Sequence, residues 1–497
     1  MRLLQLRNGL LVLLAGLLVA ACVMQRSPIT GQKRAYGYSW EEEKQLGAQA
    51  DKQIQQQYGV YEDEELQTYV EDIGQRVLAQ SHMRREDTQQ KYKETEFHFR
   101  VLNSPVPNAF ALPGGYVYVT RGLLGHLENE AQLAVVLGHE IGHVAARHSS
   151  QRAFEQQIGQ IALLGGAVAG QELLGVPGGE ILNMGSQAAQ LLFLSYGRED
   201  ERESDQLGVE YASMENYNAA EGAGFFSALK RISEQSGQSI PAWASTHPDP
   251  SEREDRIPEL AREWEQKGYE QKITGTDQFM NVIDGLVFGE NPREGFAREG
   301  TFYHPELEFQ FRYPSAWNVI NQTTMVGVVN DDEDAIIIME IDSEADSPQA
   351  SVRSFVNQEG ITVQGQQQQS INGLDAYQAT ATATGDNNTK YKFYVSALSF
   401  DENIYRFISY SVAEKFDGYE SQFVNAINSF TRLTDQSILN IQPARLQAFR
   451  TDRSAAFSSF VPQNLPMDIT AEDLAIANQV QLNETIEAGS WIKIPRQ

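Results

Sequence analysis

Cysteine is almost absent from this chain: Cys22 is the only one among 497 residues. A single cysteine excludes an intrachain disulfide and a zinc site built from four cysteines. Long apolar runs are also missing, because the run from Gly9 to Ala21 is shorter than the roughly twenty residues that a membrane-spanning helix needs. The sequence therefore predicts neither a disulfide scaffold nor a membrane-crossing apolar helix.

The N-terminal segment has the pattern of a bacterial export signal. Basic residues precede the apolar run, and residues 19–22 read Val-Ala-Ala-Cys, which resembles a bacterial lipobox. We predict a signal peptide at residues 1–21, a lipid attached to Cys22 and a tether at residues 22–39. An ordinary cleaved signal peptide is the alternative. Valine at position 23, where aspartate would resemble an inner-membrane retention signal, favours the outer membrane.

Positive charge is scarce, since 39 lysines and arginines stand against 67 aspartates and glutamates, a net charge of −28. Loss of the signal peptide removes two arginines and brings the net charge to −30. So acidic a chain repels nucleic acid and anionic lipid, which excludes both as partners. Membrane contact then depends on the lipid at Cys22, and we expect the protein at the periplasmic face of the cell envelope, anchored to the outer membrane.

Histidine is rare as well, with eight in the chain, yet three lie between positions 139 and 148. His139 and His143 are one turn apart on one face of an apolar helix that periodicity predicts over residues 130–157. Glu140 follows the first of them. A lone histidine in such a helix is more often a core residue with one satisfied hydrogen bond. The H-E-x-x-H spacing instead predicts two imidazoles that hold Zn²⁺ and a glutamate that acts as general base.

Two neighbours of this motif have different expected places. His148 is nine residues beyond His139, about 180° around a continuous helix, so we expect a structural role rather than metal binding. Arg147, four residues beyond His143, is expected on the ligand face.

A catalytic zinc site needs a third protein ligand and an open position. Acidic candidates gather in one short segment, at Glu199, Asp200, Glu201, Glu203 and Asp205. Such a run is usually a solvated helix face. Here an apolar-periodic helix follows directly, and Glu201 and Asp205 are four apart on one face. That pair suits a zinc carboxylate and an acceptor that orients a ligating imidazole.

Four segments in order carry a family resemblance: NSPVPNAFALPGGYVYVTRGLL, HEIGHVAARH, SYGREDERESD and STHPDPSER. Over about residues 27–260 the chain resembles the M48 (Ste24/HtpX-related) zinc metallopeptidases, and among them the periplasmic lipoproteins related to the outer-membrane protein-assembly protease. The chain departs from the family in one visible way, with Ser204 where alanine is usual.

The resemblance implies roles for individual residues. His139, His143 and Glu201 would hold one zinc ion per chain. Glu140 would be the general base, and Asp205 would orient a ligand. His247, otherwise a turn histidine before a proline, would be the family's movable histidine, able to approach the zinc or to stabilise the transition state. Arg253 belongs to the same motif and would assist catalysis.

The implied reaction is hydrolysis of peptide bonds in extended, misfolded or unassembled envelope proteins. The predicted strand over 115–120 is expected to offer a sheet edge to which such a substrate adds. The Gly-rich apolar segment 159–194 is expected to form a helical hairpin that covers the site. The rival hypothesis is an envelope assembly factor or chaperone with a latent or structural zinc site, against which Glu140 argues because a structural site has no use for a free base.

The fold predicted from these patterns is multidomain. A mainly α zincin-type metallopeptidase domain with a small β-sheet is expected over residues 40–270, followed by a linker at 271–300. Alternating aromatic and β-branched residues over 301–435, with a helix near 418–430, predict an antiparallel α+β domain. That domain resembles the PsbP/Mog1-like fold. No fixed-period repeat is present, which argues against a tetratricopeptide array.

The C-terminal tail, residues 440–497, resembles a degenerate LysM module through Leu474, Asn478, the Ala488-Gly489 pair and the closing WIKIP. A LysM module would suggest contact with peptidoglycan. The more common alternative is a module for packing or for binding an envelope protein.

Overall fold

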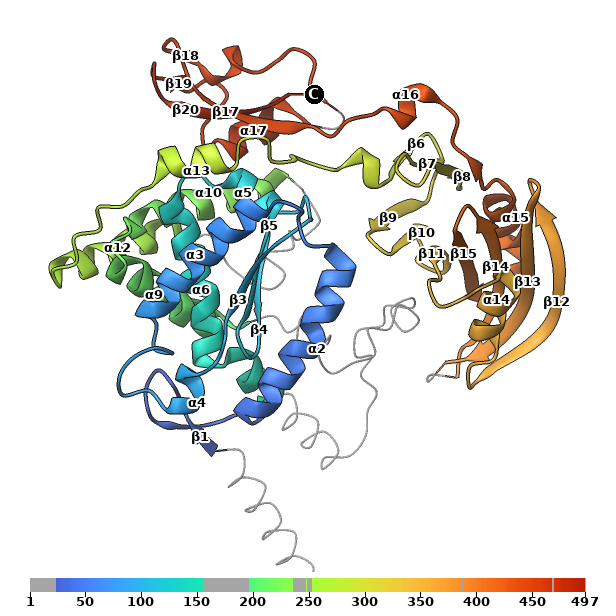
Figure 1. The fold of residues 1–497 in the computed structure, drawn as a ribbon, viewed down its shortest axis with the longest axis horizontal. Coiled ribbons are helices and arrows are strands. Elements are labelled where there is room, and N and C mark those ends of the chain that lie inside the picture. The colour runs from blue at the N-terminus through green and yellow to red at the C-terminus, as the bar shows by residue number, and fades with distance from the viewer. Residues whose placement is uncertain are drawn as a thin grey trace, which may run out of the picture. The chain divides into compact units, whose positions relative to one another are not determined.

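The computed structural model describes residues 24–155, 196–235, 247, 253–385, 388–466 and 469–496. Cys22, the predicted signal peptide and the predicted hairpin at 159–194 lie outside these residues. The chain divides into two compact units (Figure 1): the described residues before Glu290 and after Pro443 form unit 1, and residues 290–443 form unit 2. Within the described ranges, no helix combines the length and apolar character needed to cross a membrane.

Unit 1 begins with a short β1 (Met24–Arg26) and β2 (Lys33–Ala35) pair and then two helices, α2 (Trp40–Tyr58) and α3 (Glu64–Gln80). Ser39 begins α2 with a capping box, and Gly59 ends it with a positive φ of 68°, which a glycine adopts without strain. The predicted break near Gly59 is therefore present.

A three-stranded sheet follows, made of β3 (His98–Leu102), β4 (Ala109–Leu112) and β5 (Tyr116–Thr120). The spatial order is β3-β5-β4, with β5 parallel to β3 and antiparallel to β4. The prediction that residues 115–120 form a sheet edge is wrong, because β5 is the central strand. The Pro113-Gly114-Gly115 turn, with φ of 82° and 105° at its glycines, folds the short β4 back against β5. The edges are β3 and β4.

Helix α6 (Glu130–Ala146) carries the H-E-x-x-H motif, and all of its residues are buried. Asn129 caps its first turn by accepting a hydrogen bond from the Gln132 amide. Other helices of unit 1 surround it: α4 (Gln90–Lys93), α5 (Arg121–His126), α9 (Arg198–Met214), α10 (Gly222–Gln235), α12 (Arg253–Gln266) and α13 (Thr276–Val282).

Helix α9 packs directly on α6 because both helices have glycine at the contact. A Cβ atom on Gly208 would lie 2.8 Å from the His139 amide nitrogen, and one on Gly138 would lie 2.9 Å from the Gly208 carbonyl oxygen. At Gly142 a Cβ would lie 3.2 Å from Leu207 Cβ. The close approach brings the acidic first turns of α9 beside the histidines of α6.

The tail is part of unit 1. Strands β17 (Arg445–Arg450) and β20 (Trp491–Arg496) pair antiparallel, with α17 (Ala471–Ala477) and the small β18 (Ala455–Ala456) and β19 (Thr485–Ile486) pair between them in sequence. Apolar side chains of the tail lie in the same core as α6: Leu446, Phe457, Leu474, Ile486, Ile492 and Ile494. The tail thus does not form a compact unit of its own, and its LysM likeness stays a prediction.

Part of the predicted linker also packs into unit 1. Phe279 and Met280 of α13 are buried in the core that contains α6. Residues 285–288 then hydrogen-bond to the start of the tail, with Leu446 N donating to Leu286 O and Phe288 N donating to Ala444 O, each at 2.8 Å. The abundance of Gly, Asp and Asn in the segment 271–300 favours a linker, but in the structure such residues form turns of a segment that packs into unit 1.

Unit 2 contains a seven-stranded antiparallel sheet in the order β12-β13-β14-β15-β11-β10-β9. Helix α15 (Phe416–Asn428) contributes apolar side chains to one core cluster and α14 (Pro348–Val356) to another, so each face of the sheet has its own helix. The strands are β9 (Asn318–Gln322), β10 (Met325–Val329), β11 (Ala335–Ile341), β12 (Ile361–Ile371), β13 (Leu374–Thr384), β14 (Lys390–Phe400) and β15 (Asn403–Val412).

A smaller four-stranded sheet and one short helix complete unit 2: β6 (Phe296–Arg298), β7 (Thr301–His304), β8 (Phe309–Arg312), β16 (Thr431–Arg432) and α16 (Gln436–Leu439). The prediction of a helical first domain followed by a β-rich region is confirmed. The predicted helix near 418–430 corresponds to α15.

Candidate metal centre

Four buried side chains converge between α6 and α9: His139, His143, Glu201 and His247. Their ligand atoms all lie within 4.8 Å of one another. His139 Nε2 is 3.0 Å from His143 Nε2 and 3.4 Å from His247 Nδ1. Glu201 Oε1 is 3.4 Å from His143 Nε2 and 3.1 Å from His247 Nδ1.

These distances fit a zinc ion. Zinc–nitrogen bonds of roughly 2.0–2.1 Å place the corners of a tetrahedron roughly 3.3 Å apart. Three imidazole nitrogens and a carboxylate oxygen are also the donor types that zinc prefers. The four residues therefore form a site able to hold one metal ion.

Glu140 lies beside the cluster without a partner that would explain its burial. Its side chain is fully buried, and neither carboxylate oxygen accepts a hydrogen bond from the described residues. Its nearest charged neighbour is His247, with Nε2 3.6 Å from Glu140 Oε1. A buried carboxylate left without hydrogen bonds is costly, which indicates that this group serves a purpose other than packing.

Burial and opposite charges together shift the pKa values of Glu201, His247 and Glu140. Burial raises the pKa of Glu201, but His247 and His143 together outweigh burial and hold that pKa well below its usual range. Burial lowers the pKa of His247, but Glu201 and Glu140 raise it above its ordinary value. Burial, partly offset by His247 and His139, raises the pKa of Glu140. Glu201 is thus a carboxylate suited to bind a cation, while Glu140 is a stronger base than an exposed glutamate.

Each imidazole of α6 has a second close neighbour, at its Nδ1 atom. His139 Nδ1 lies 3.0 Å from Asp205 Oδ1. His143 Nδ1 lies 3.0 Å from His148 Nδ1, and His148 Nε2 lies 3.2 Å from Glu203 Oε2. Carboxylates and hydrogen-bonded partners of this kind fix the tautomer and direction of ligating histidines.

The position of His148 depends on where α6 ends. Arg147 has a left-handed φ of 62°, so the helix stops at Ala146 and the chain turns before residues 148–155 resume helical structure. This turn brings His148 back toward His143, against the 180° separation expected of a continuous helix. His148 is not among the four clustered side chains, but it contacts one of them, His143.

Arg147 does not face the cluster as predicted. Its Nη2 pairs with Glu43 Oε1 at 2.5 Å and donates to the Tyr38 carbonyl at 2.8 Å. Its guanidinium also lies 3.8 Å from the centroid of the Tyr36 ring. The helix end therefore points this side chain away from the metal cluster and into the N-terminal segment.

Arg253 lies behind the carboxylates. Its Nε donates to Asp205 Oδ2 at 3.1 Å, and its Nη2 pairs with Glu201 Oε2. Its guanidinium also packs over the Phe226 ring at 5.0 Å. One buried cation thus holds Glu201 and the orienting Asp205 in a common arrangement.

Tyr196 is a residue of the site that the sequence analysis did not single out. Its ring stacks on His143 with centroids 3.8 Å apart and an interplanar angle of 22°. Its hydroxyl lies 3.1 Å from Ser149 Oγ. The only sequence signal is its place directly before the acidic run, and nothing in the periodicity indicates a contact with the helix 50 residues earlier.

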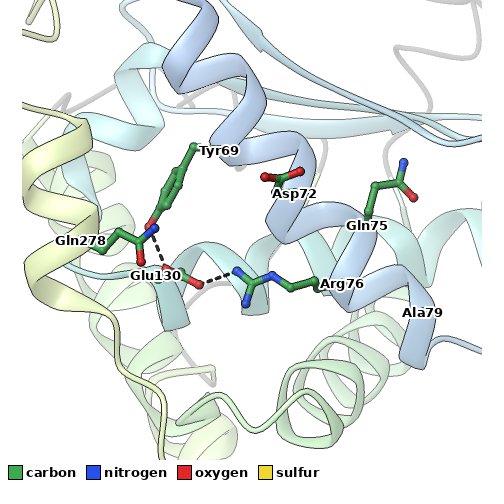
Figure 2. Close-up of a pocket in the computed structure, with 7 residues that line it drawn as sticks. All are labelled: Tyr69, Asp72, Gln75, Arg76, Ala79, Glu130 and Gln278. Carbon is green, nitrogen blue, oxygen red and sulfur yellow. Dashed lines mark hydrogen bonds and ion pairs between the residues drawn. The ribbon is translucent and has the colours of Figure 1, made fainter.

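The beginning of α6 is fixed by a separate polar cluster. Figure 2 shows Tyr69 and Arg76 directed at Glu130, with Tyr69 Oη donating at 3.0 Å and Arg76 Nη2 at 2.6 Å. Tyr217 Oη also donates to Glu130. Tyr69, Arg76 and Glu130 border a hollow of about 620 Å³ that is lined by none of the clustered histidines. A glutamate in the first turn is favourable to the helix, and its three donors anchor α6 roughly 13 Å along the axis before His139.

Comparison with known proteins shows which family part of this chain resembles. Residues 64–261 match Peptidase family M48. The resemblance predicted from the four motifs is confirmed, and so is the prediction of one zinc site, since the M48 metallopeptidases use zinc and the four clustered residues can hold one ion.

Two relatives illustrate the extent of the match. The chain is 31% identical over 239 residues to the mitochondrial metalloendopeptidase OMA1 of Schizosaccharomyces pombe, covering 47% of this chain and 65% of that protein. It is 29% identical over 202 residues to the beta-barrel assembly-enhancing protease of Yersinia pestis, covering 38% and 37%. The chain thus spans less than two thirds of either relative.

Among solved structures, the cyanobacterial PsbP of Synechocystis sp. PCC 6803 matches with a TM-score of 0.23 and 14% identity, over 27% of this chain and 91% of that one. The PsbP/Mog1-like resemblance of residues 301–435 stays a prediction.

Proposed function

We propose that this chain is a zinc-dependent endopeptidase of the bacterial cell envelope that hydrolyses peptide bonds in misfolded or unassembled envelope proteins. The observation that carries the proposal is the buried Glu140 carboxylate, which accepts no hydrogen bond from the described residues, beside four converging metal donors. The match to the M48 peptidases and to relatives named as metalloendopeptidase and protease supports it.

His139, His143 and Glu201 would hold the zinc. The ion, when bound, supplies a Lewis acid that polarises the scissile carbonyl and lowers the pKa of water. Glu140 then accepts the proton of the attacking water and passes it to the leaving amine. Its elevated pKa suits both halves of that transfer.

Asp205 and His148 would keep the two imidazoles of α6 aimed at one point. Arg253 has a positioning role in this proposal, because both of its ion pairs are with Glu201 and Asp205. Its pairing with Glu201 also offsets the negative charge gathered there.

His247 would close the site at rest. Catalytic zinc sites leave one position to water or substrate, whereas His247 Nδ1 stands within 3.4 Å of His139 Nε2 as a fourth donor. We infer that His247 must leave this position before a substrate is cleaved, and that it can then stabilise the transition state from nearby.

Lipid attachment at Cys22 would hold the enzyme at the periplasmic face of the outer membrane. The lipobox-like sequence and the strongly acidic composition support this placement. The relative from Yersinia pestis bears a name that refers to beta-barrel assembly.

A second candidate is an assembly factor or chaperone with a structural zinc site. The four protein donors favour it, because structural zinc sites are closed in this way. Glu140 again distinguishes the two, since a structural site needs no base next to it.

The test compares wild type with Glu140→Gln on unfolded casein, with zinc content measured in both. We expect Glu140→Gln to keep its fold and zinc and to lose at least about 100-fold in turnover, the scale for removal of a general base. Glu199→Gln is the matched control, because Glu199 is an exposed glutamate on α9. Equal turnover in wild type and Glu140→Gln would refute the peptidase role of this site and favour the structural one.

A further inference from the structure

Strand β12 (Ile361–Ile371) forms one edge of the large sheet of unit 2, as Figure 1 shows. It is eleven residues long, pairs with β13 alone among the described strands, and is exposed over most of its length. A bulge lies between Val363 and Gly365, after which Gly365–Ile371 pair with β13 in unbroken register. The second half of β12 is therefore a regular edge.

A strand at the border of a sheet presents unpaired N–H and C=O groups, to which any other extended chain can pair. Proteins commonly protect long edges with lysine, proline or a covering segment. The β12 sequence, ITVQGQQQQSI, has no charged residue and no proline. At the opposite edge, Asn321 of β9 donates to the carbonyls of Glu294 and Gly295, so a neighbouring segment contacts that strand.

We propose that residues 366–371 of β12 bind an extended segment of an unfolded polypeptide by strand addition. Main-chain hydrogen bonds give such binding its affinity, so it tolerates many sequences. Six residues match the usual length of a strand. The inference rests on the proposed function in that the bound segment would belong to a peptidase substrate.

Charge selects the kind of partner. From Asn357 to Gly385 the only charged residues are Glu359 and Asp375, both acidic. Gln368 Nε2 already donates to Asp375 Oδ1 at 3.1 Å. The edge thus favours a neutral or basic segment. A second copy of this chain, with a net charge of −28, is repelled over the rest of its surface.

The test measures binding of a fluorescent, unfolded and basic polypeptide, ribonuclease A that has been reduced and carbamidomethylated, to the full chain carrying Glu140→Gln, so that binding is read without cleavage. In an antiparallel edge strand, alternate residues direct their N–H outward. At one of the two positions in Gln367→Pro and Gln368→Pro the N–H points away from β13, so that variant keeps its hydrogen bonds to β13, and thermal unfolding identifies which variant it is. That variant should weaken binding of the unfolded ribonuclease by about tenfold or more, since proline removes an outward donor and blocks close approach.

A second pair of variants adds charge instead of proline. Gln366→Lys with Gln368→Lys should weaken binding, whereas Gln436→Lys with Gln442→Lys adds the same charge at exposed positions elsewhere in unit 2 and should not. Unchanged binding in both the fold-retaining proline variant and the double lysine variant would overturn the proposal. If sedimentation showed that the β12 variants change the oligomeric state while binding of the unfolded ribonuclease stays intact, the proposal would be overturned in favour of self-association.

These outcomes are separate from those of the peptidase test. Loss of binding of the unfolded ribonuclease in the β12 variants, together with absence of casein hydrolysis in wild type, would leave strand addition standing and remove the peptidase function. Normal hydrolysis in wild type, together with unchanged binding in the β12 variants, would support the peptidase function and remove the strand-addition proposal.

Discussion

At the scale of single residues, the contacts behind the ligands decide how well zinc is held. Asp205 lies 3.0 Å from Nδ1 of His139, and His148 lies 3.0 Å from Nδ1 of His143. Loss of such partners commonly reduces metal affinity by about 10- to 100-fold. Their chemistry differs, since one is a carboxylate and the other an imidazole whose Nε2 contacts Glu203.

We therefore expect Asp205→Asn and His148→Phe each to weaken zinc binding by about 10- to 100-fold without loss of the fold. Competition with a chromophoric chelator would measure the affinity, and circular dichroism would check the fold. Glu199→Gln again serves as the control. Wild-type zinc affinity in His148→Phe would show that its contact with His143 is only a packing contact.

Buried histidines outside the site make stability depend on pH. Burial lowers the pKa of His126 to about 4, against about 6.5 for an unfolded chain. Between these two pH values the unfolded state binds a proton at His126 that the folded state does not bind. The contribution of His126 to the free energy of unfolding is therefore complete above about pH 6.5 and is lost as the pH falls toward 4. The same shift to about 4 holds for His304 in unit 2.

We therefore predict that the melting temperature of unit 1 falls as the pH is lowered from 6.5 to 4, and that it falls less in His126→Asn than in wild type. The comparison of the two proteins cancels the titration of other groups. An identical pH slope in wild type and variant would contradict the assignment to His126.

At the scale of elements, the α6–α9 contact sets the geometry of the site. The two histidines come from one helix and Glu201 from another, so the distance between helix backbones determines whether the donors meet. Gly208 permits that distance because its Cα faces the His139 amide.

Gly208→Ala should push α9 away from α6, since its Cβ would lie 2.8 Å from a backbone nitrogen. We expect zinc affinity to fall by about tenfold or more, the scale on which misplaced ligand support acts. Gly418→Ala on α15 is the control, because a Cβ there meets nothing within 4 Å. Zinc affinity is measured as above. Equal zinc affinity in both variants would mean that the helices adjust without moving Glu201.

Much of this arrangement was predictable from local sequence, and the failures have local causes. Residues four apart lie on one face of any α-helix, so the sequence alone predicts that the side chains of His139 and His143 lie close together. The place of His148 was not predicted, because a single left-handed residue at Arg147 leaves no trace in hydrophobic periodicity. The central position of β5 was missed because β4 has only four residues and follows a segment with two prolines.

At the scale of the whole molecule, unit 1 combines the described residues before Glu290 with those after Pro443. The tail supplies Leu474, Ile492 and Ile494 to the core around α6, and buries Lys493, which donates to the carbonyls of Gly125 at 3.1 Å and Leu127 at 2.5 Å. Periodicity could not predict this, because pairing between residues 285 and 445 is a long-range property of the fold.

A chain that ends at Pro443 should therefore fail to form a stable unit 1. Each large apolar side chain lost from a core costs about 2–5 kcal/mol, and several such losses exceed the usual stability of about 5–15 kcal/mol. Residues 290–443 alone should fold. Thermal melts and zinc content of both products test this, and a truncated chain that binds zinc and melts cooperatively would contradict it.

The pairing of residues 285–288 with 444–446 has a consequence for the order of biosynthesis. Because domains fold as the chain emerges, unit 2 can form while unit 1 still lacks its last strand and helix. The metal-binding half is then completed only when the C-terminus has been delivered to its folding compartment. A broken or unfinished polypeptide would carry every residue of the H-E-x-x-H motif and still have no assembled centre, so metal binding is expected of the finished chain alone.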